Sequence, residues 1–113
     1  MSFRGILIAN RGEIAIRIAR AAQDLGLRTV AVYSDDDALS LHTQIADEKI
    51  RLEGAGAAAY LNMEGVIAAA KQADCDAIHP GYGFLSEQDA FAQLCTNAAV
   101  SYTHLRAHET SRN

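Results

Sequence analysis

Two short polar stretches hold the residue types that could do chemistry in this chain. Residues 10–13 read Asn-Arg-Gly-Glu and residues 79–83 read His-Pro-Gly-Tyr-Gly. The first stretch directly follows an apolar run typical of a buried strand, and the second begins at the end of a short predicted strand, residues 76–79. Ligands of open α/β sheets gather beyond the carboxyl ends of the strands, so both stretches are expected at the ligand-binding edge of one sheet.

Tyr82 is the most informative residue of the second stretch, because it stands between Gly81 and Gly83. The two glycines permit unusual backbone angles and leave the tyrosine ring uncrowded. Two interpretations of the ring stay open: contact with a ligand, or packing that closes the loop. His79 is either a hydrogen-bonding residue that fixes the loop or a base. For Arg11 the simplest interpretation is stabilisation of its turn through Glu13 or a later acid.

The first stretch is a poor dinucleotide-binding loop. That function needs three glycines in the pattern G-x-G-x-x-G, so that backbone can approach a pyrophosphate. The loop supplies only Gly12, while asparagine and isoleucine stand at positions 10 and 14, and Glu13 would repel phosphate. The acidic run at residues 35–37 does resemble the acid that binds ribose. A dinucleotide-binding module is therefore kept as the alternative, and NAD and NADP are expected not to bind.

The pattern along the chain predicts four strands that alternate with four helices. This order indicates an α/β fold, a Rossmann-like open parallel sheet with helices on both faces. Asn62 is the expected N-cap of the third helix, and a helix stop is expected at Gly26. The expected strands are residues 5–9, 28–33, 49–53 and 76–79, and the expected helices are residues 13–25, 34–46, 63–73 and 86–98.

Composition excludes several classes of function. The 113 residues suffice for one domain, and the net charge of −4 without a basic run argues against nucleic-acid binding. No membrane span or secretory pattern is visible, which favours a cytoplasmic protein. Cys75 and Cys95 are expected to be reduced and packed. No metal site is expected: His42 is interpreted as a packing residue, and His104 and His108 lack a third ligand.

The apolar pattern breaks after Ala99, where a fifth strand would be due. Residues 100–113, VSYTHLRAHETSRN, hold only scattered apolar residues. This segment resembles the in-frame translation of a sequencing-library adaptor. We therefore expect a single domain over residues 1–99 and a non-native tail over residues 100–113, and the underlying nucleotides would test that interpretation.

Several longer strings give the chain a specific family resemblance. They are IANRGEIAIRIARAA (residues 8–22), TVAVYSDDD (29–37), ADE (46–48), YLN (60–62) and IHPGYGFLSE (78–87). Together they resemble the N-terminal domain of biotin carboxylase, the domain that precedes an ATP-grasp region, from about Phe3 to about Ala98. The departures are small. The 54–59 loop is short and lacks the usual prolines, and Gln88 replaces a common asparagine.

The resemblance implies a function for a longer enzyme. That enzyme is an ATP-dependent ligase, in which ATP with Mg²⁺ or Mn²⁺ activates bicarbonate and the carboxyl group passes to biotin on a carrier protein or domain. The catalytic residues lie in the ATP-grasp region, so none is expected here, and the fragment alone should be inactive and bind no cofactor. A carboxyltransferase is the further partner, and it chooses the acceptor: acetyl-, propionyl-, methylcrotonyl- or geranyl-CoA, pyruvate or urea.

Four residues receive roles from the same resemblance. Tyr82 and the backbone of Gly83 match positions that border the biotin ureido ring. Arg20 and Asp24 match positions at a homodimer contact, although the acid at position 24 is usually one methylene longer. These roles follow from the resemblance and not from the spacing of the residues.

Overall fold

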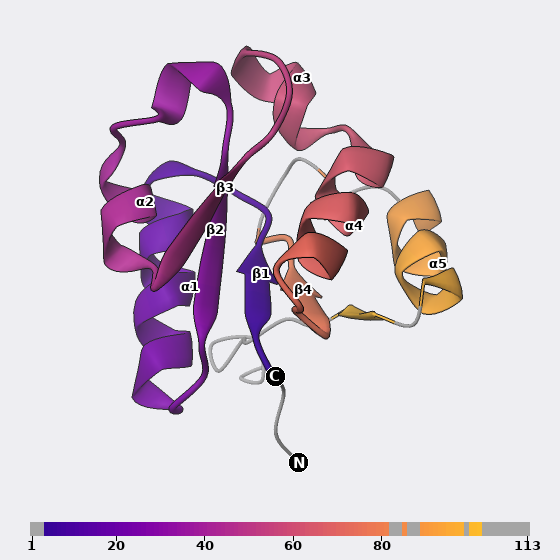
Figure 1. The fold of residues 1–113 in the computed structure, drawn as a ribbon, viewed down its shortest axis with the longest axis horizontal. Coiled ribbons are helices and arrows are strands. Elements are labelled where there is room, and N and C mark those ends of the chain that lie inside the picture. The colour runs from indigo at the N-terminus through magenta and orange to yellow at the C-terminus, as the bar shows by residue number, and fades with distance from the viewer. Residues whose placement is uncertain (1–3, 82–84, 86–88, 99, 103–113) are drawn as a thin grey trace.

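The core of the protein is one twisted, fully parallel sheet (Figure 1). The computed structural model describes residues 4–81, 85, 89–98 and 100–102. Within these residues the sheet has five strands in the order β3-β2-β1-β4-β5. The predicted α/β class and parallel sheet are therefore confirmed. The strands are β1 (Ile6–Ile8), β2 (Thr29–Tyr33), β3 (Glu48–Arg51), β4 (Ala77–His79) and β5 (Ser101–Tyr102).

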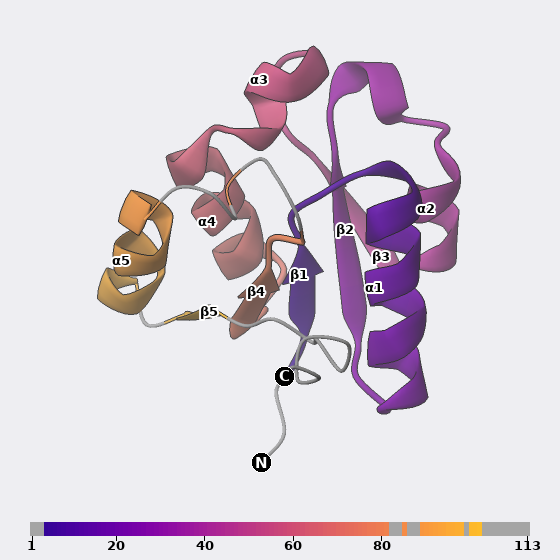
Figure 2. The same cartoon turned by 180° about the vertical axis from the view of Figure 1, so that it is seen from behind.

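Helices cover both faces of the sheet (Figures 1 and 2). The first two pack on one face, where Ile14, Ile18 and Ile45 surround Ile8 of β1. The other three cover the opposite face, where Tyr60 and Phe91 join the largest apolar cluster. The described helices are α1 (Gly12–Asp24), α2 (Leu41–Ile45), α3 (Gly56–Tyr60), α4 (Met63–Gln72) and α5 (Asp89–Asn97), with a short 3₁₀ helix at Asp35–Asp37.

The central strand β1 shows why its sequence has no polar alternation. Ile6, Leu7 and Ile8 are all fully buried, with Leu7 facing one apolar cluster and its two neighbours facing the others. A strand covered on both faces needs apolar residues at successive positions. The capping prediction is also confirmed, because the Gly65 N–H donates to Oδ1 of Asn62 at 3.0 Å, ahead of α4.

The predicted helix over residues 34–46 is wrong in its extent. The chain forms the 3₁₀ helix Asp35–Asp37 and then α2, and between them Ser40 has extended backbone angles. The break has a physical cause: the Asp37 carboxylate accepts from the Ser40 hydroxyl at 3.2 Å, and the Asp37 carbonyl accepts from the Ser40 N–H at 2.9 Å. Side chains that bond nearby backbone and hydroxyl groups compete with a continuous helix.

Two further elements were not predicted. Helix α3 occupies the stretch that the sequence suggested was loop, because its three alanines have high helix propensity and Tyr60 anchors its end in the core. Strand β5 lies where no strand was expected. Val100 is buried in the main cluster, and the Ser101 N–H donates to the Asp76 carbonyl at 2.9 Å. Strand pairing uses backbone groups, so this short pairing tolerates the polar sequence of residues 100–113.

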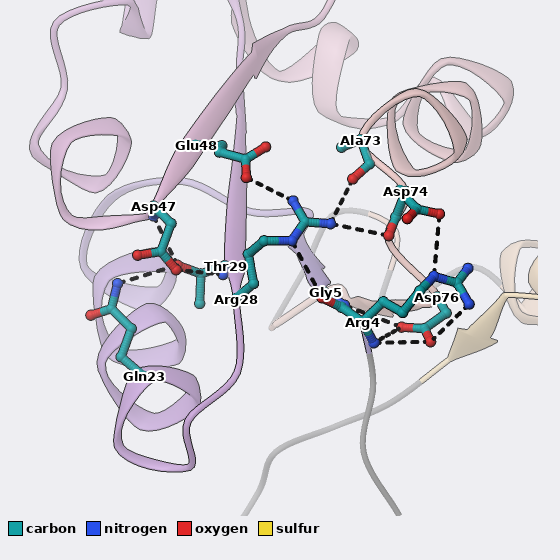
Figure 3. A network of polar contacts seen from close by, with 10 residues as sticks. All are labelled: Arg4, Gly5, Gln23, Arg28, Thr29, Asp47, Glu48, Ala73, Asp74 and Asp76. Carbon is teal, nitrogen blue, oxygen red and sulfur yellow. Dashed lines mark hydrogen bonds and ion pairs between the residues drawn. The ribbon is translucent and has the colours of Figure 1, made fainter.

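A polar network secures the amino ends of the strands (Figure 3). The Arg28 guanidinium donates to the carbonyls of Ala73 and Asp74, which directly follow α4, at 2.7 and 3.1 Å. It also pairs with Glu48 at 2.8 Å and approaches the Arg4 carbonyl at 3.3 Å. One side chain thus ties together the segments around β1, β2, β3 and α4. The two polar stretches begin at the other ends of the strands, the carboxyl ends.

Both cysteines are reduced and buried, as predicted. Burial raises the pKa of each thiol, Cys75 and Cys95, to about 11. We expect a thiol-specific reagent to label neither cysteine in the native chain near neutral pH, because the thiolate is the reactive form and solvent does not reach it. Labelling followed by mass spectrometry measures this, with the guanidinium-unfolded chain as the control in which both thiols react. Fast labelling of the native chain would contradict the packing described here.

No helix in the described ranges is long and apolar enough to cross a membrane.

Candidate functional site

The candidate site lies where strand order reverses, between the adjacent strands β1 and β4. From this pair the chain winds outward in both directions, to β2 and β3 on one side and β5 on the other. Ile8 and His79 are paired in register, and the Ala9 N–H donates to the His79 carbonyl at 2.9 Å. The two polar stretches therefore start side by side at the carboxyl edge. Such reversal points are where open α/β sheets bind ligands.

Asn10 joins the two stretches directly. Its side chain is almost fully buried, with 1% exposed. The Nδ2 group donates to the carbonyl of Pro80 at 2.7 Å, and Oδ1 accepts from the backbone N–H of Arg11 at 2.8 Å. The Asn10 amide thus donates a hydrogen bond to the second stretch and accepts one from the first.

Position 81 favours glycine for two reasons: its backbone conformation and the closeness of neighbouring side chains. Its φ is +71°, in the left-handed region, and its N–H donates to Nδ1 of His79 at 3.0 Å. A Cβ at position 81 would lie 2.7 Å from Nδ2 of Asn10 and 2.9 Å from Cγ2 of Ile14. The loop therefore begins from a fixed, closely packed point. His79 acts here as a loop-fixing hydrogen bonder, one of its two predicted roles.

Arg11 forms an ion pair with Asp37, which confirms the prediction that a later acid stabilises its turn. Its Nε and a terminal nitrogen donate to the two oxygens of Asp37 at 2.6 and 2.8 Å. The Tyr60 hydroxyl donates to Asp37 at 2.6 Å and accepts from the Ser34 N–H at 3.1 Å. Asp37 is thus the centre of a network that fixes the first polar stretch to the ends of β2 and α3.

The network shifts the ionisation of its members in the directions that stabilise it. Hydrogen bonding to Arg11 holds the pKa of Asp37 far below its ordinary value of 3.8, and the same bond raises the pKa of the Arg11 guanidinium. Burial, with help from Asp37, raises the pKa of Tyr60 to about 12. Asp37 is therefore a permanent carboxylate, and Tyr60 is a permanent hydrogen-bond donor, near neutral pH.

Tyr82 and Gly83, the two residues expected at the biotin, lie outside the described residues, as do His104 and His108. Arg20 and Asp24, expected at a dimer contact, are both exposed on α1. Their spacing of four residues places them on one face of that helix. Neither forms an ion pair with another residue of the described ranges. Both are thus presented to the exterior of this domain.

The first stretch does not offer the geometry of a dinucleotide site. The Arg11 N–H, which would face a pyrophosphate, already donates to Asn10 Oδ1, and the Asn10 side chain fills the position of the fingerprint's first glycine. Glu13 is exposed in the first turn of α1. Among the described residues, no cluster of three His, Cys, Asp or Glu side chains could hold a metal ion.

His42 is buried, as the packing interpretation predicted, with its Nε2 at 3.1 Å from the Val32 carbonyl. That contact requires a proton on Nε2, so Nδ1 is the unprotonated nitrogen, and it has no hydrogen-bond partner among the residues that the structure describes. Burial lowers the pKa of His42 from its ordinary 6.5, a shift that nearby Asp37 opposes and Arg11 assists. Protonation would place a second, unaccepted N–H in the core.

We expect the free energy of unfolding to fall as the pH drops below 6.5, the ordinary histidine pKa. The folded pKa of His42 is the lower one, so the unfolded chain binds the proton first and acid favours unfolding. His42→Gln keeps a donor for Val32 but does not titrate, and it should flatten this part of the profile. Urea unfolding at several pH values measures the effect. An equal slope in the variant would exclude His42 as the cause.

The sequence did not predict which residues hold Arg11 in place. Nothing in it distinguishes Asp37, which binds Arg11, from the two acids beside it, or marks Tyr60 as the residue that binds Asp37. The contact between Tyr60 and Asp37 depends on helix α3, whose alanine-rich sequence shows no helical periodicity. The one usable signal was the need of Arg11 for a later acid.

Comparisons with known proteins agree on one family. The family described as biotin carboxylase, N-terminal domain, matches residues 2–104. Biotin carboxylase of Nostoc is 50% identical over 103 residues, which are 90% of this chain and 23% of that protein. Pyruvate carboxylase of Staphylococcus aureus is 52% identical over 99 residues, 86% of this chain and 9% of that protein.

A solved structure shows the same fold. It is the biotin carboxylase domain dimer of Hydrogenobacter thermophilus 2-oxoglutarate carboxylase, in complex with MgADP, ADP and bicarbonate. The TM-score is 0.83 and the identity 40%, over 90% of this chain and 22% of that one. The chain therefore spans less than a quarter of the length of each of these three proteins.

Proposed function

The chain belongs to the biotin carboxylase N-terminal domain family, and from this we propose that it serves in an ATP-dependent biotin carboxylase. That enzyme would carboxylate carrier-bound biotin with bicarbonate. The observation that supports this most strongly is the junction at the strand reversal, where Asn10 fixes Pro80 and Gly81 next to the first polar stretch. The junction gives the second stretch a defined place at the ligand edge.

In this proposal Tyr82 and Gly83 border the biotin, and the chain itself holds no catalytic residue. ATP, Mg²⁺ or Mn²⁺ and bicarbonate would be bound by the remainder of the enzyme, and they supply the phosphoryl-transfer chemistry that activates bicarbonate. The described residues fit this division. The Arg11 guanidinium is engaged by Asp37, and the loop carries no lysine that could hold a phosphate. The segment's task is to shape and close the biotin side of the site.

The partners follow from the same proposal. A second copy would contact Arg20 and Asp24, and a biotin carrier and a carboxyltransferase would bind the enzyme elsewhere. The reduced, buried thiols Cys75 and Cys95 fit the reducing cytoplasm. The relatives include enzymes named for different acceptors, among them pyruvate carboxylase, urea amidolyase and 2-oxoglutarate carboxylase.

A chimera tests the proposal. Residues 1–99 of this chain, the predicted native domain, would replace the matching segment of Nostoc biotin carboxylase, to which the chain is 50% identical over 103 residues. We expect the chimera to cleave ATP in a bicarbonate-dependent reaction that free biotin stimulates, and we expect the isolated chain to do neither. A chimera that folds and dimerises but shows no stimulation by biotin would contradict the proposal.

The alternative, a free-standing dinucleotide-binding module, makes the opposite prediction for the isolated chain. The module would bind NAD with a dissociation constant in the micromolar range. Our account predicts no measurable heat on titration with NAD or NADP, because the loop N–H is engaged and Glu13 repels phosphate. Isothermal titration calorimetry separates the two.

A further inference from the structure

We propose that α2 is a pH-sensitive element of the fold: protonation of His42 releases this helix from β2 while the sheet stays folded. Helix α2 lies on the outer side of the molecule, beside α1 (Figures 1 and 2). The first response to acid is thereby assigned to one helix, ahead of the unfolding of the whole chain. This device does not depend on the proposed function, because it involves only groups that lie within the described residues.

Helix α2 is held to the protein mainly by polar side chains. It has five residues, and its fully buried side chains are those of His42 and Thr43. The apolar side chains of the helix contribute less, because Leu41 is 56% exposed and Ile45 is half-buried. A helix of this length is not stable by itself in water. Segments with few buried apolar contacts open locally at low cost, and α2 has the properties of such a segment.

The imidazole of His42 is the group through which acid can release the helix. It is 1% exposed, and its Nε2 lies 3.1 Å from the carbonyl of Val32 in β2. Its Nδ1 is buried as well and has no hydrogen-bond partner within the described ranges. Protonation of Nδ1 would create a charged ring with a buried N–H that lacks an acceptor, which is unfavourable unless the ring reaches water. Release of α2 would give both ring nitrogens that access.

The charged groups around His42 do not offset the effect of its burial. Burial lowers the pKa of His42 from its ordinary 6.5, the Val32 carbonyl and Asp37 oppose this shift, and Arg11 assists it. Asp37 and Arg11 are paired with each other at 2.6 and 2.8 Å, so the carboxylate is already engaged. The elements that pack most extensively against α2 are α1, β2 and β3. Their other charged or titratable side chains are all at least partly exposed: Glu13, Arg17, Arg20 and Asp24 on α1, Tyr33 on β2, and Glu48, Lys49 and Arg51 on β3.

The direction of the pH effect follows from the two states of the histidine. Its pKa is lowered while α2 is closed and has the ordinary value of 6.5 when α2 is open, so the open form binds the proton first. The opening constant should therefore rise about tenfold for each pH unit below 6.5, until the closed form also binds the proton. The response reaches the first polar stretch through Ser40, the residue before α2, whose hydroxyl donates at 3.2 Å to the Asp37 carboxylate that holds Arg11.

Native-state hydrogen exchange of the original chain tests the inference. The hydrogen-bonded amides of Thr43 and Ala46 report on α2, and those of Val66 and Ala73 report on α4. We expect the α2 amides to exchange through an opening that low urea concentrations do not promote, because little surface is exposed, whereas urea should promote exchange of the α4 amides. After correction for intrinsic exchange rates, the α2 opening constant should rise about tenfold per pH unit below 6.5. Equal urea dependence of both helices, or an α2 opening constant that is independent of pH, would overturn the inference.

Two variants show whether His42 is the cause. His42→Gln keeps a donor for Val32 but does not titrate, so its α2 opening constant should no longer rise below pH 6.5. Thr43→Val is the matched control, because Thr43 is the other buried residue of α2 and donates to the Ser40 carbonyl at 2.7 Å. It should raise the opening constant at every pH and keep the rise below 6.5. An unchanged pH dependence in His42→Gln would overturn the inference. If that variant does not fold, NMR titration of His42 in the original chain decides, and a ring pKa at or above 6.5 would overturn it.

Discussion

Asp37→Asn should destabilise the chain by about 2–4 kcal/mol, the largest loss of stability that we expect from a single polar substitution. The amide cannot accept both nitrogens of Arg11 and the Tyr60 hydroxyl together. It also leaves the Arg11 charge without its partner. The estimate is at the lower end for a buried pair, because the Arg11 side chain is 48% exposed and water partly replaces the lost contact. Urea unfolding followed by circular dichroism measures the loss.

Asp35→Asn is the matched control for this prediction. Asp35 lies two residues earlier and pairs with Arg51 at 2.6 Å, the same distance as the Arg11–Asp37 contact. The Asp35 side chain is 47% exposed, against 6% for Asp37. Exposed ion pairs contribute little to stability because water screens them, so the control should be nearly silent. Similar losses of unfolding free energy in both variants would show that the burial of Asp37 is not the cause of the destabilisation.

The acid response of the Asp37 variant provides a second readout. The folded pKa of Asp37 lies below its ordinary 3.8, so its stabilisation is complete above that pH and is lost as the pH falls further. Asp37→Asn lacks this stabilisation at every pH. The difference in unfolding free energy between the original chain and the variant should therefore shrink below pH 3.8. A constant difference would contradict the assigned ionisation.

Tyr82→Ala in the chimera should reduce productive use of biotin by about ten- to a hundredfold, with a much smaller effect on ATP. In the proposed role, the ring would offer an apolar face to the ureido and thiophane groups of biotin, and its hydroxyl would offer an orienting hydrogen bond. The prediction depends on the fixed start of the loop at Gly81. Steady-state constants for both substrates, with the melting temperature of each variant, measure the result.

Two further variants separate contact with biotin from loop packing. If Tyr82 only packs, Tyr82→Phe should be silent, and Tyr82→Ala should lower the melting temperature and all kinetic constants together. Tyr33→Ala is the control for the loss of a tyrosine at the same edge, because Tyr33 ends β2 and holds Lys49 over its ring at 5.7 Å. This control should leave the KM for biotin unchanged. An unaltered biotin dependence in Tyr82→Ala would make Tyr82 a structural residue.

Four of the five described strands were predictable because their signals are local. The unbroken apolar run of β1 indicated a strand covered on both faces, and Asn62 marked the start of α4. The elements that were wrong or missing depend on distant partners. The Asp35–Asp37 segment breaks from α2 because Asp37 bonds Arg11 and Ser40, and α3 is anchored by a tyrosine that reaches the same carboxylate.

The candidate site was predictable in its location but not in its connections. Two polar stretches at strand ends predicted a common edge, and β1 and β4 do lie side by side. The bond between Asn10 and Pro80 joins residues 70 positions apart, and no local pattern reports such a contact. Its only trace in the sequence is the pair of small, special residues that permit it: a glycine at position 81 and an asparagine where a dinucleotide loop would have glycine.

The most direct test of the proposed function is the transfer of labelled carbon from bicarbonate to free biotin by the chimera. The account predicts ATP-dependent incorporation into biotin at a rate within about tenfold of the parent Nostoc enzyme, because the grafted segment shapes the biotin side and leaves the activating chemistry intact. Incorporation should fall sharply with Tyr82→Ala. A folded, dimeric chimera that still cleaves ATP with bicarbonate but transfers no label to biotin would contradict the central claim.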